Sequence, residues 1–355
     1  MRILRATSSL ERIPLSRPYT IAYASFDAVE MCRVRLEADN GLVGLGCGSP
    51  AEMITGETPR SAETALADRL GAVLEGTVLE PLPALLARVD EAFRETPAAR
   101  AAVDLALHDL WGKGLGRPLV EIFGRCHRRM ATSVTVGILD AQEALEEARE
   151  WMARGFRCLK IKIGRNLEEE LELLTLLRAE LGDAVRIRVD ANQGYRADQL
   201  PILFSSLGRL GIELVEQPLP PAEDAALGDL VPADRRLAAG DESVQTPGDA
   251  RRLAARGTYG VFNIKLMKCG GIEPARRIAA TAEEAGIGLM WGCMDESVAS
   301  LAGALHAAFA SPATRFLDLD GSLDLARDPA RGGFEIEDGM LRLLDRPGLG
   351  IEAAD

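Results

Sequence analysis

The chain has 355 residues, of which 47% are apolar and 27% are charged. This composition is typical of a globular protein with a sizeable core and excludes an intrinsically disordered chain. The 41 lysines and arginines are outnumbered by 54 aspartates and glutamates, which gives a formal net charge of −13. Because nucleic acids and anionic membrane surfaces repel such a charge, neither is an expected partner. At roughly 150 residues per domain, the length predicts about two domains.

The beginning of the chain and its cysteines indicate a cytoplasmic protein. The first twelve residues carry charges throughout and contain no apolar stretch typical of a secretory signal. No apolar run reaches the length of a membrane span. The six cysteines are scattered, without a CxxC pair or a nearby histidine at zinc-site spacing. We therefore expect reduced cysteines that serve mostly in packing.

Residues 1–130 predict an α+β unit. Strand-like segments at 1–9, 32–38 and 41–47 precede segments of helical periodicity at 63–76 and 97–116. The glycines of 41–50 have neither dinucleotide-binding nor phosphate-loop spacing, so we assign them to turns. We expect this unit to cap the rest of the chain and to leave a cleft at the junction.

Residues 131–321 alternate short apolar segments with longer helical ones, which is typical of βα units in a parallel sheet. Candidate strands lie at 134–138, 158–164, 185–192, 212–218, 237–244, 260–266, 286–294 and 316–321. Eight such units predict an α/β fold with a closed (β/α)8-type TIM barrel under the N-terminal α+β capping domain. An open doubly wound sheet is the alternative, but its glycine-rich fingerprint is absent. We expect the tail, residues 322–355, to return to the first unit.

Three consecutive predicted strands each present one carboxylate near the end where catalytic groups of a barrel lie: Asp190, Glu216 and Asp241. Three hard oxygen ligands that converge on one point suit Mg²⁺. Asn192, two residues after Asp190, is placed to support the same site. The alternative is a set of ion-paired carboxylates at the barrel rim.

Lysines lie on the second and sixth predicted strands. Lys160 and Lys162 share one face of their strand because side chains alternate. Lys265 is four strands further around the ring, so Lys162 and Lys265 would face each other across the barrel axis. This geometry predicts that one lysine removes a substrate α-proton and the other returns a proton to the opposite face, through an enediolate that the metal stabilises.

A lysine must be neutral to act as a base. The charge of Lys160, together with burial, would lower the pKa of Lys162, which assigns Lys160 an electrostatic role in catalysis. We expect Lys268 to lie outside the barrel. The alternative for the KxK pattern is a solvated strand rim, since lysine is usually a surface residue.

The segments KIK, RVDANQG, ELVEQP, GDES and NIKLMKCGG, in this order, resemble the enolase superfamily, in particular its muconate-lactonising-enzyme subgroup. The resemblance covers nearly the whole chain. It implies a capping domain on a barrel, Mg²⁺ on Asp190, Glu216 and Asp241, and acid/base roles for Lys162 and Lys265. It leaves open cycloisomerisation, o-succinylbenzoate synthesis, N-acylamino acid racemisation and dipeptide epimerisation.

The eighth predicted strand narrows this choice. Asp318 and Asp320 share one face of that strand, across the barrel from the metal carboxylates, and two extended residues span roughly 7 Å. A dipeptide could therefore place its carboxylate at Mg²⁺ and its α-ammonium at these aspartates. The DxDG motif resembles the dipeptide epimerases of the subgroup. An acidic strand end that faces solvent is the alternative.

The last group of candidate residues would select the side chains of the substrate. Epimerases of Ala-Glu dipeptides resemble this chain but carry an arginine in the loop after the first strand, where this chain has Ala24, within about a residue. Glu52 in the next cap loop, and Asp295 and Glu296 after the seventh barrel strand, are acidic instead. We hypothesise that Glu52 or Asp295 contacts a basic side chain, which would favour dipeptides with Lys or Arg. Surface acidity without a role in binding is the alternative.

The sequence thus predicts a Mg²⁺-dependent isomerase that inverts the C-terminal residue of an L,L-dipeptide by two-base 1,1-proton transfer. His108, His127 and His306 lie away from strand ends, which disfavours a histidine base. The alternative enzymes are an N-acylamino acid racemase or an o-succinylbenzoate synthase. An inactive ligand-binding homologue is the alternative from another class. We expect a homo-oligomer with a small-molecule substrate.

Overall fold

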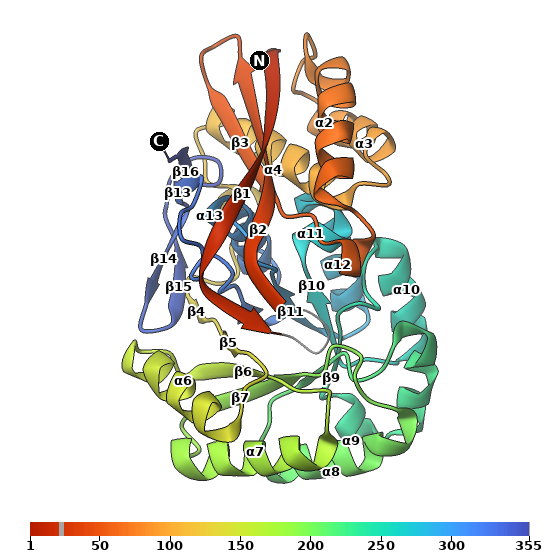
Figure 1. The fold of residues 1–355 in the computed structure, drawn as a ribbon. Helices are drawn as coiled ribbons and strands as arrows, with labels where there is room; N and C mark the ends of the chain where they lie inside the picture. The colour runs from red at the N-terminus through yellow and green to blue at the C-terminus, as the bar shows by residue number, and fades with distance from the viewer. Residues whose placement is uncertain (21–24, 355) are drawn as a thin grey trace.

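The structure, a computed structural model, describes residues 1–20 and 25–354. An antiparallel sheet in the order β1-β2-β3 opens the chain, and helices pack beside it (Figure 1). The strands are β1 (Ile3–Thr20), β2 (Ser25–Ala38) and β3 (Val43–Gly48), and the helices are α1 (Glu52–Thr55), α2 (Pro59–Leu74), α3 (Leu82–Ala92), α4 (Pro97–Gly114) and α5 (Leu119–Phe123). The predicted strands and the two long helices of this unit are confirmed, whereas α1, α3 and α5 are additions to the prediction.

Glycines of β3 allow a close approach to α4. A Cβ atom on Gly46 would lie 2.1 Å from the carbonyl oxygen of Ala102, and Gly44 and Gly48 meet α4 in the same way. The assignment of these glycines to turns was therefore wrong. Only Gly41, with a φ of +81°, lies in the turn before β3. Here glycine serves packing rather than backbone freedom, because any side chain would push the helix off the strand.

The barrel consists of eight parallel strands in chain order. They are β5 (Val134–Val136), β6 (Cys158–Lys162), β7 (Arg186–Asp190), β8 (Val215–Glu216), β9 (Ala238–Gly240), β10 (Val261–Ile264), β11 (Gly288–Gly292) and β12 (Thr314–Asp318). A parallel bridge between Thr132 and Leu317 joins the last strand to the start of the first. The predicted barrel is confirmed, with β8 and β9 shorter than expected.

Helices cover the outside of the barrel (Figure 1). They are α6 (Ala141–Ala153), α7 (Leu167–Leu181), α8 (Leu200–Arg209), α9 (Pro232–Arg235), α10 (Pro247–Arg256), α12 (Ile272–Glu284) and α13 (Val298–Phe309), with 3-10 segments η1 (Ala197–Gln199) and η2 (Pro221–Asp229). The short helix α11 (Leu266–Cys269) is buried directly after β10. The apolar sides of the helices and the strands form one continuous core that includes Leu174, Phe204 and Ile278. This packing fixes the strand ends that carry the polar residues.

The tail after the barrel forms four short strands. They are β13 (Ala330–Gly332), β14 (Phe334–Glu337), β15 (Met340–Leu343) and β16 (Ile351–Ala353). β14 and β15 form a sheet with β4 (Met130–Ala131), while β13 pairs with β16. Nearer the barrel, the backbone N–H of Ser16 donates to the carbonyl of Asp324 at 2.7 Å, so the tail contacts β1. The domain boundaries at 130 and 321 stay predictions.

Helix α4 connects the N-terminal unit to the barrel. Its Asp104 accepts a 2.7 Å hydrogen bond from the backbone N–H of Ile272, at the start of α12. Asp104 also lies 3.0 Å from His108 Nδ1, and both side chains are buried. An acidic side chain at a helix start satisfies N–H groups that have no partner within the helix. This buried hydrogen bond therefore fixes the position of the N-terminal unit relative to the barrel.

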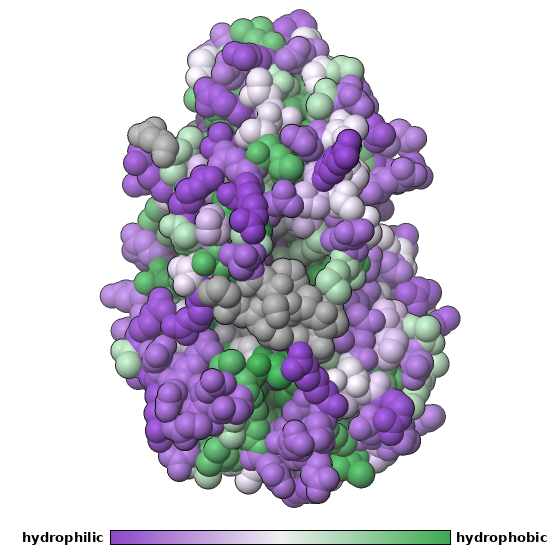
Figure 2. Space-filling model, in the orientation of Figure 1, coloured by the Kyte–Doolittle hydropathy of each residue, from purple (hydrophilic) through white to green (hydrophobic). Residues whose placement is uncertain are grey.

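The cysteines, His306 and the surface residues differ in their exposure to solvent. All six cysteines are free, and Cys126 is exposed rather than packed. His306 is buried, and its Nδ1 accepts from the backbone N–H of Val120 at 3.0 Å. Hydrophilic residues predominate over most of the face in Figure 2. Among the described residues, the helices are too short or too polar to cross a membrane.

Replacing Gly46 with alanine should lower the free energy of unfolding by about 2–3 kcal/mol, because the new methyl group would overlap α4. Urea denaturation measures this change. The matched control is Gly208→Ala in α8, where a Cβ meets no atom within 4 Å. That control should be neutral or stabilising by up to about 1 kcal/mol. A Gly46→Ala protein as stable as wild type would contradict the close packing.

Candidate active site

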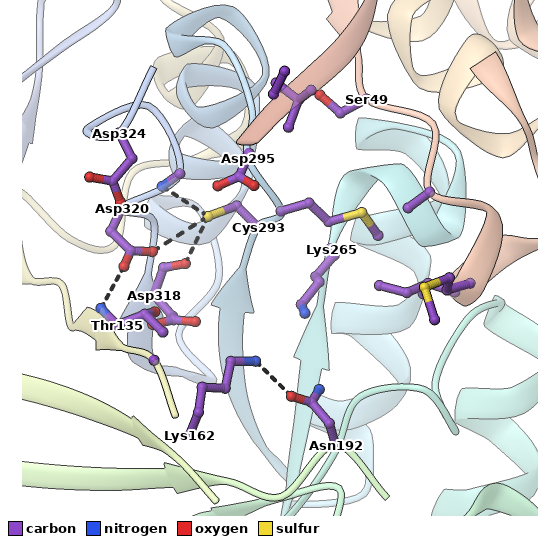
Figure 3. Close-up of a pocket in the computed structure, with 18 of the residues that line it drawn as sticks. Ser49, Thr135, Lys162, Asn192, Lys265, Cys293, Asp295, Asp318, Asp320 and Asp324 are labelled. Atoms are coloured by element: carbon purple, nitrogen blue, oxygen red, sulfur yellow. Dashed lines mark hydrogen bonds between the residues drawn. The ribbon is translucent and has the colours of Figure 1, made fainter. Parts of the chain in front are cut away.

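A cavity of 670 Å³ lies where the N-terminal unit meets the carboxyl ends of the barrel strands. Its wall combines residues from the cap, such as Ser49 and Glu52, with residues from several barrel strands. Figure 3 shows the lysines and aspartates that converge on it. The candidate residues of the sequence that line this cavity are Glu52, Lys160, Lys162, Asn192, Lys265, Asp295, Asp318 and Asp320.

The three predicted metal carboxylates lie buried at neighbouring strand ends. Asp190 ends β7, Glu216 ends β8, and Asp241 directly follows β9; none is more than 1% exposed. Each contacts ammonium groups. Lys162 Nζ donates to Asp190 at 2.7 Å and Lys265 Nζ to Asp241 at 2.8 Å. In this arrangement, no group of three acidic, histidine or cysteine side chains in the described ranges is poised to hold a metal ion, because lysines lie between the carboxylates.

The charges nevertheless suit a divalent cation. Burial and the neighbouring charge of Asp190 raise the pKa of Glu216 to about 8, and Asp241 adds to the effect. Burial, together with Asp241 and Asp190, raises the pKa of Glu242 to about 7. Glu242 Oε2 is buried without a hydrogen-bond partner in the described part of the chain. Carboxylates that repel one another in a buried place are the donor set that a hard cation stabilises.

Lys160 is enclosed by carboxylates. Its Nζ contacts Asp318 and lies 3.5 Å from Glu216 and 3.6 Å from Asp190. Burial alone would lower the pKa of Lys160, but these carboxylates outweigh it and raise the pKa well above the usual value. Lys160 is therefore a permanent cation that holds opposite sides of the ring together. Its predicted effect on the pKa of Lys162 stays a prediction.

The two candidate acid/base lysines enter the cavity from strands that are four positions apart in the ring, β6 and β10 (Figure 3). Lys162 ends β6, and its Nζ also donates to Asn192 Oδ1 at 2.8 Å. Lys265 directly follows β10. Burial would lower the pKa of Lys265, but Asp241 and then Glu216 raise it, so this side chain is held as an ammonium group.

Lys268 belongs to the site, and the prediction that it lies outside the barrel was wrong. Its side chain is fully buried, and its Nζ contacts the carboxylate of Asp241 and donates to the carbonyl of Asn263 at 3.1 Å. The short helix α11 begins at Leu266 and turns the chain back over the strand end. Lys265 and Lys268 are three residues apart, about one helical turn. This spacing could have predicted that both lysines reach the same carboxylate.

Asp318 and Asp320 lie on the side of the cavity opposite Asn192 (Figure 3). Asp318 ends β12, so Asp320 follows the strand rather than sharing its face as predicted. Asp320 Oδ2 accepts from the backbone N–H of Thr135 at 2.7 Å. Burial and the charge of Asp318 raise the pKa of Asp320 to about 7. A cationic ligand group would relieve this repulsion.

Sequence reasoning missed Ser133 and Arg188, which orient Asp318. Ser133 Oγ donates to Asp318 Oδ1 at 2.6 Å. Arg188, fully buried in the barrel, donates to Ser133 Oγ at 3.2 Å. Cys293 lines the cavity and lies 3.8 Å from Asp320 Oδ1. Burial raises the pKa of its thiol well above the usual value, so it is not a thiolate nucleophile. Ser133 and Cys293 are uncharged and gave no signal of this role in the sequence. Arg188 did give one, because its alternation with Asp190 along the strand places it inside the barrel.

The predicted selectivity residues have different positions. Glu52 begins α1, and Asp295 follows β11; both line the cavity. Glu296 turns inward instead, where it is 1% exposed and accepts from the backbone N–H of Met294 at 2.9 Å. Burial raises the pKa of Glu296 to about 7. Ala24 lies outside the described residues.

Comparison with known proteins agrees with this geometry. Residues 5–124 match the mandelate racemase / muconate lactonizing enzyme N-terminal domain, and residues 143–355 match the enolase C-terminal domain-like family. An L-Lys-D/L-Arg epimerase from Desulforapulum autotrophicum is 50% identical over 99% of this chain and 99% of its own length. An L-Ala-D/L-Glu epimerase from Bacillus subtilis is 34% identical over 100% of this chain and 98% of its own length.

The solved structures include a dipeptide epimerase from Methylococcus capsulatus in complex with Mg and the dipeptide L-Arg-D-Lys. It superposes with a TM-score of 0.97 at 51% identity and covers 99% of both chains. With both domains matched and the barrel confirmed, this chain belongs to the mandelate racemase/muconate lactonizing enzyme family of the enolase superfamily.

Proposed function

We propose that the protein is a Mg²⁺-dependent dipeptide epimerase that inverts the α-carbon of the C-terminal residue of an L,L-dipeptide and prefers Lys or Arg side chains. The observation that carries the proposal is one cavity lined by two lysines from strands four positions apart and by a pair of aspartates on β12 and just after it. The 50% identity to an L-Lys-D/L-Arg epimerase over almost the whole chain supports the same activity.

The cavity orients a dipeptide by its charged ends. The α-ammonium group meets Asp318 and Asp320, and the C-terminal carboxylate lies toward the strand ends of Asp190, Glu216 and Asp241. Mg²⁺, when held by these three carboxylates, supplies a Lewis acid that stabilises negative charge on the substrate carboxylate. Extended dipeptides span roughly 7 Å, which places the α-carbon of the second residue between the two ends.

Lys162 and Lys265 exchange the α-proton. In one direction Lys162 Nζ accepts the proton, and Lys265 Nζ, which its carboxylate neighbours hold as ammonium, donates a proton to the opposite face. The configuration of the α-carbon is inverted as a result. Asn192, which accepts from Lys162 at 2.8 Å, orients the lysine side chain. Lys265 is buried and Lys162 is partly buried, which limits proton loss to water.

The aspartates distinguish this function from its alternatives. An N-acylated amino acid has no α-ammonium group and would leave the buried charges of Asp318 and Asp320 without a ligand partner. An inactive binding homologue would not need two lysines in the cavity. The acidic side chains of Glu52 and Asp295 line the same cavity and favour a basic side chain on the residue that is inverted.

We also propose a cytoplasmic enzyme that acts on a soluble small dipeptide. The free state of all six cysteines is in keeping with a reducing compartment. The expected homo-oligomer stays a prediction.

Magnesium should raise the melting temperature of the wild-type protein by about 5 °C at saturating concentration, because it binds only the folded state. Chelation with EDTA should reverse the shift. Asp241→Asn should abolish it, whereas Glu150→Gln, on an exposed helix surface, should retain it. Differential scanning fluorimetry measures all four results. An unchanged wild-type melting temperature in Mg²⁺ would contradict metal binding at these carboxylates.

Exchange of the α-proton in D₂O should show that the lysines work on opposite faces. Lys162→Ala and Lys265→Ala should each lower epimerisation of L-Lys-L-Arg by at least about 10³-fold. Each variant should still exchange the α-proton of one diastereomer, and the two variants should prefer opposite diastereomers. Proton NMR with L-Lys-L-Arg and L-Lys-D-Arg measures both.

The Mg²⁺-induced melting shift is the folding control for these lysine variants. Epimerisation at the wild-type rate in either variant would refute the two-base mechanism. Exchange of the same diastereomer by both variants would place the two lysines on one face.

Selectivity for the inverted residue should depend on Glu52 or Asp295. The wild-type enzyme should favour L-Lys-L-Arg over L-Lys-L-Ala, and Glu52→Gln or Asp295→Asn should reduce that ratio of kcat/KM by about tenfold, the size of one charge-assisted hydrogen bond. Polarimetric assays with the two substrates give the ratio. Equal wild-type rates for the two dipeptides would refute the basic preference.

A further inference from the structure

We propose that Asp324 selects a cationic side chain on the N-terminal residue of the dipeptide, independently of the residues that select the C-terminal side chain. The inference rests on the proposed function, because it takes the α-ammonium group of the substrate to lie at Asp318 and Asp320. It extends that function by assigning a residue to the recognition of the N-terminal side chain.

Asp324 lies at the end of the cavity that would receive the N-terminal residue. It follows Asp320 by four residues, and both line the cavity. Figure 3 shows Asp324 beside Asp320, on the side away from Lys265. A side chain that leaves the carbon next to the α-ammonium group therefore starts close to Asp324. The C-terminal side chain starts from the carbon between the lysines instead.

The main chain around Asp324 is held in place by β1. The backbone N–H of Ser16 donates to the Asp324 carbonyl at 2.7 Å, and Ala326 N–H donates to the carbonyl of Pro14 at 2.9 Å. Leu15 and Leu325 form an antiparallel bridge between these two contacts. The carboxylate is thus presented by a fixed backbone, which limits the entropy that binding would cost.

The charge of Asp324 is available to a ligand. Among the described residues, no hydrogen bond or ion pair engages its carboxylate, although it is only partly exposed. The nearby cation Arg17 is already paired with Glu147 at 3.1 Å and with Glu150 at 2.9 Å. Arg154, the other arginine whose charge acts on Asp324, has its guanidinium group 4.1 Å from the ring centre of Trp151.

The neighbouring wall suits a long cationic side chain rather than a compact one. Leu139, which is 37% exposed, lines the same cavity after β5. Strand β5 lies beside Asp320, because the backbone N–H of Thr135 donates to Asp320 Oδ2 at 2.7 Å. The methylene stem of lysine or arginine can pack on Leu139 while its charged end reaches Asp324. An acidic side chain would be repelled, and alanine would leave the carboxylate without a partner.

The test compares dipeptides that differ only at the N-terminal residue. The N-terminal ratio is kcat/KM for L-Lys-L-Arg divided by kcat/KM for L-Ala-L-Arg, and in the Mg²⁺-loaded enzyme it should fall by about tenfold in Asp324→Asn. The C-terminal ratio is kcat/KM for L-Lys-L-Arg divided by kcat/KM for L-Lys-L-Ala. It should change by less than about twofold, because Asp324 does not contact the C-terminal side chain.

Two control variants sharpen the comparison. Glu180→Gln removes one negative charge from α7, where Glu180 pairs with Arg149 outside the cavity, and it should leave the N-terminal ratio unchanged. Whichever of Glu52→Gln and Asp295→Asn lowers the C-terminal ratio should leave the N-terminal ratio unchanged. The asparagine variant preserves the backbone bonds to β1, and an unchanged melting temperature checks this.

The possible outcomes separate the inference from the function on which it rests. An unchanged N-terminal ratio in Asp324→Asn, or faster turnover of L-Lys-L-Arg, would overturn the inference; the latter result would mean that Asp324 only neutralises Arg17. A fall in both ratios would show that one carboxylate serves both positions and would also overturn it. Absence of epimerisation of every dipeptide by the wild-type enzyme would refute the proposed function itself.

Discussion

Opposite charges buried at the carboxyl ends of the barrel strands are the constraint on which the site depends. Ammonium groups cannot remain in such a place without carboxylates, and the carboxylates cannot remain without cations. Lys160 is the centre of this arrangement because it contacts Asp318 on one side of the ring and lies near Asp190 and Glu216 on the other. Removal of one member leaves its partners as uncompensated charges in the interior.

The barrel is what makes this concentration of charge possible. Parallel strands place their carboxyl ends at one rim, and the register pairs Asp190 with Glu216 directly. Two further polar residues, one charged and one neutral, complete the arrangement. Arg188 donates a hydrogen bond to Ser133, and Ser133 donates one to Asp318. The carboxylate of Asp318 is therefore oriented from the barrel interior as well as by Lys160.

Much of this site follows from periodicity in the sequence. Asp190, Glu216 and Asp241 recur at the length of one βα unit, and a closed ring then fixes which strands are opposite. The side chains that escaped prediction are those whose position depends on irregular backbone. Lys268 lies in the site because α11 turns directly after β10. Asp320 was predicted in the site, but it follows its strand instead of sharing a strand face with Asp318. Asp324 escaped because its place is set by pairing with β1, which is more than three hundred residues away in the chain.

The cap was predicted in outline but not in its packing. Alternation identified the strand around Gly46, yet glycine in a strand has two explanations, a turn or a close neighbour. Only the position of α4 distinguishes them, and that position depends on contacts with residues far away in the sequence. The neutral Ser133 and Thr135 gave no signal for the same reason.

The bond from Asp104 of α4 to the start of α12 has a consequence for the cavity. Because this helix anchors the cap to the barrel independently of the loops that line the cavity, those loops can change in sequence while the strand ends that carry the lysines stay in place. An anchor of this kind allows the shape of the cavity to change without moving the barrel.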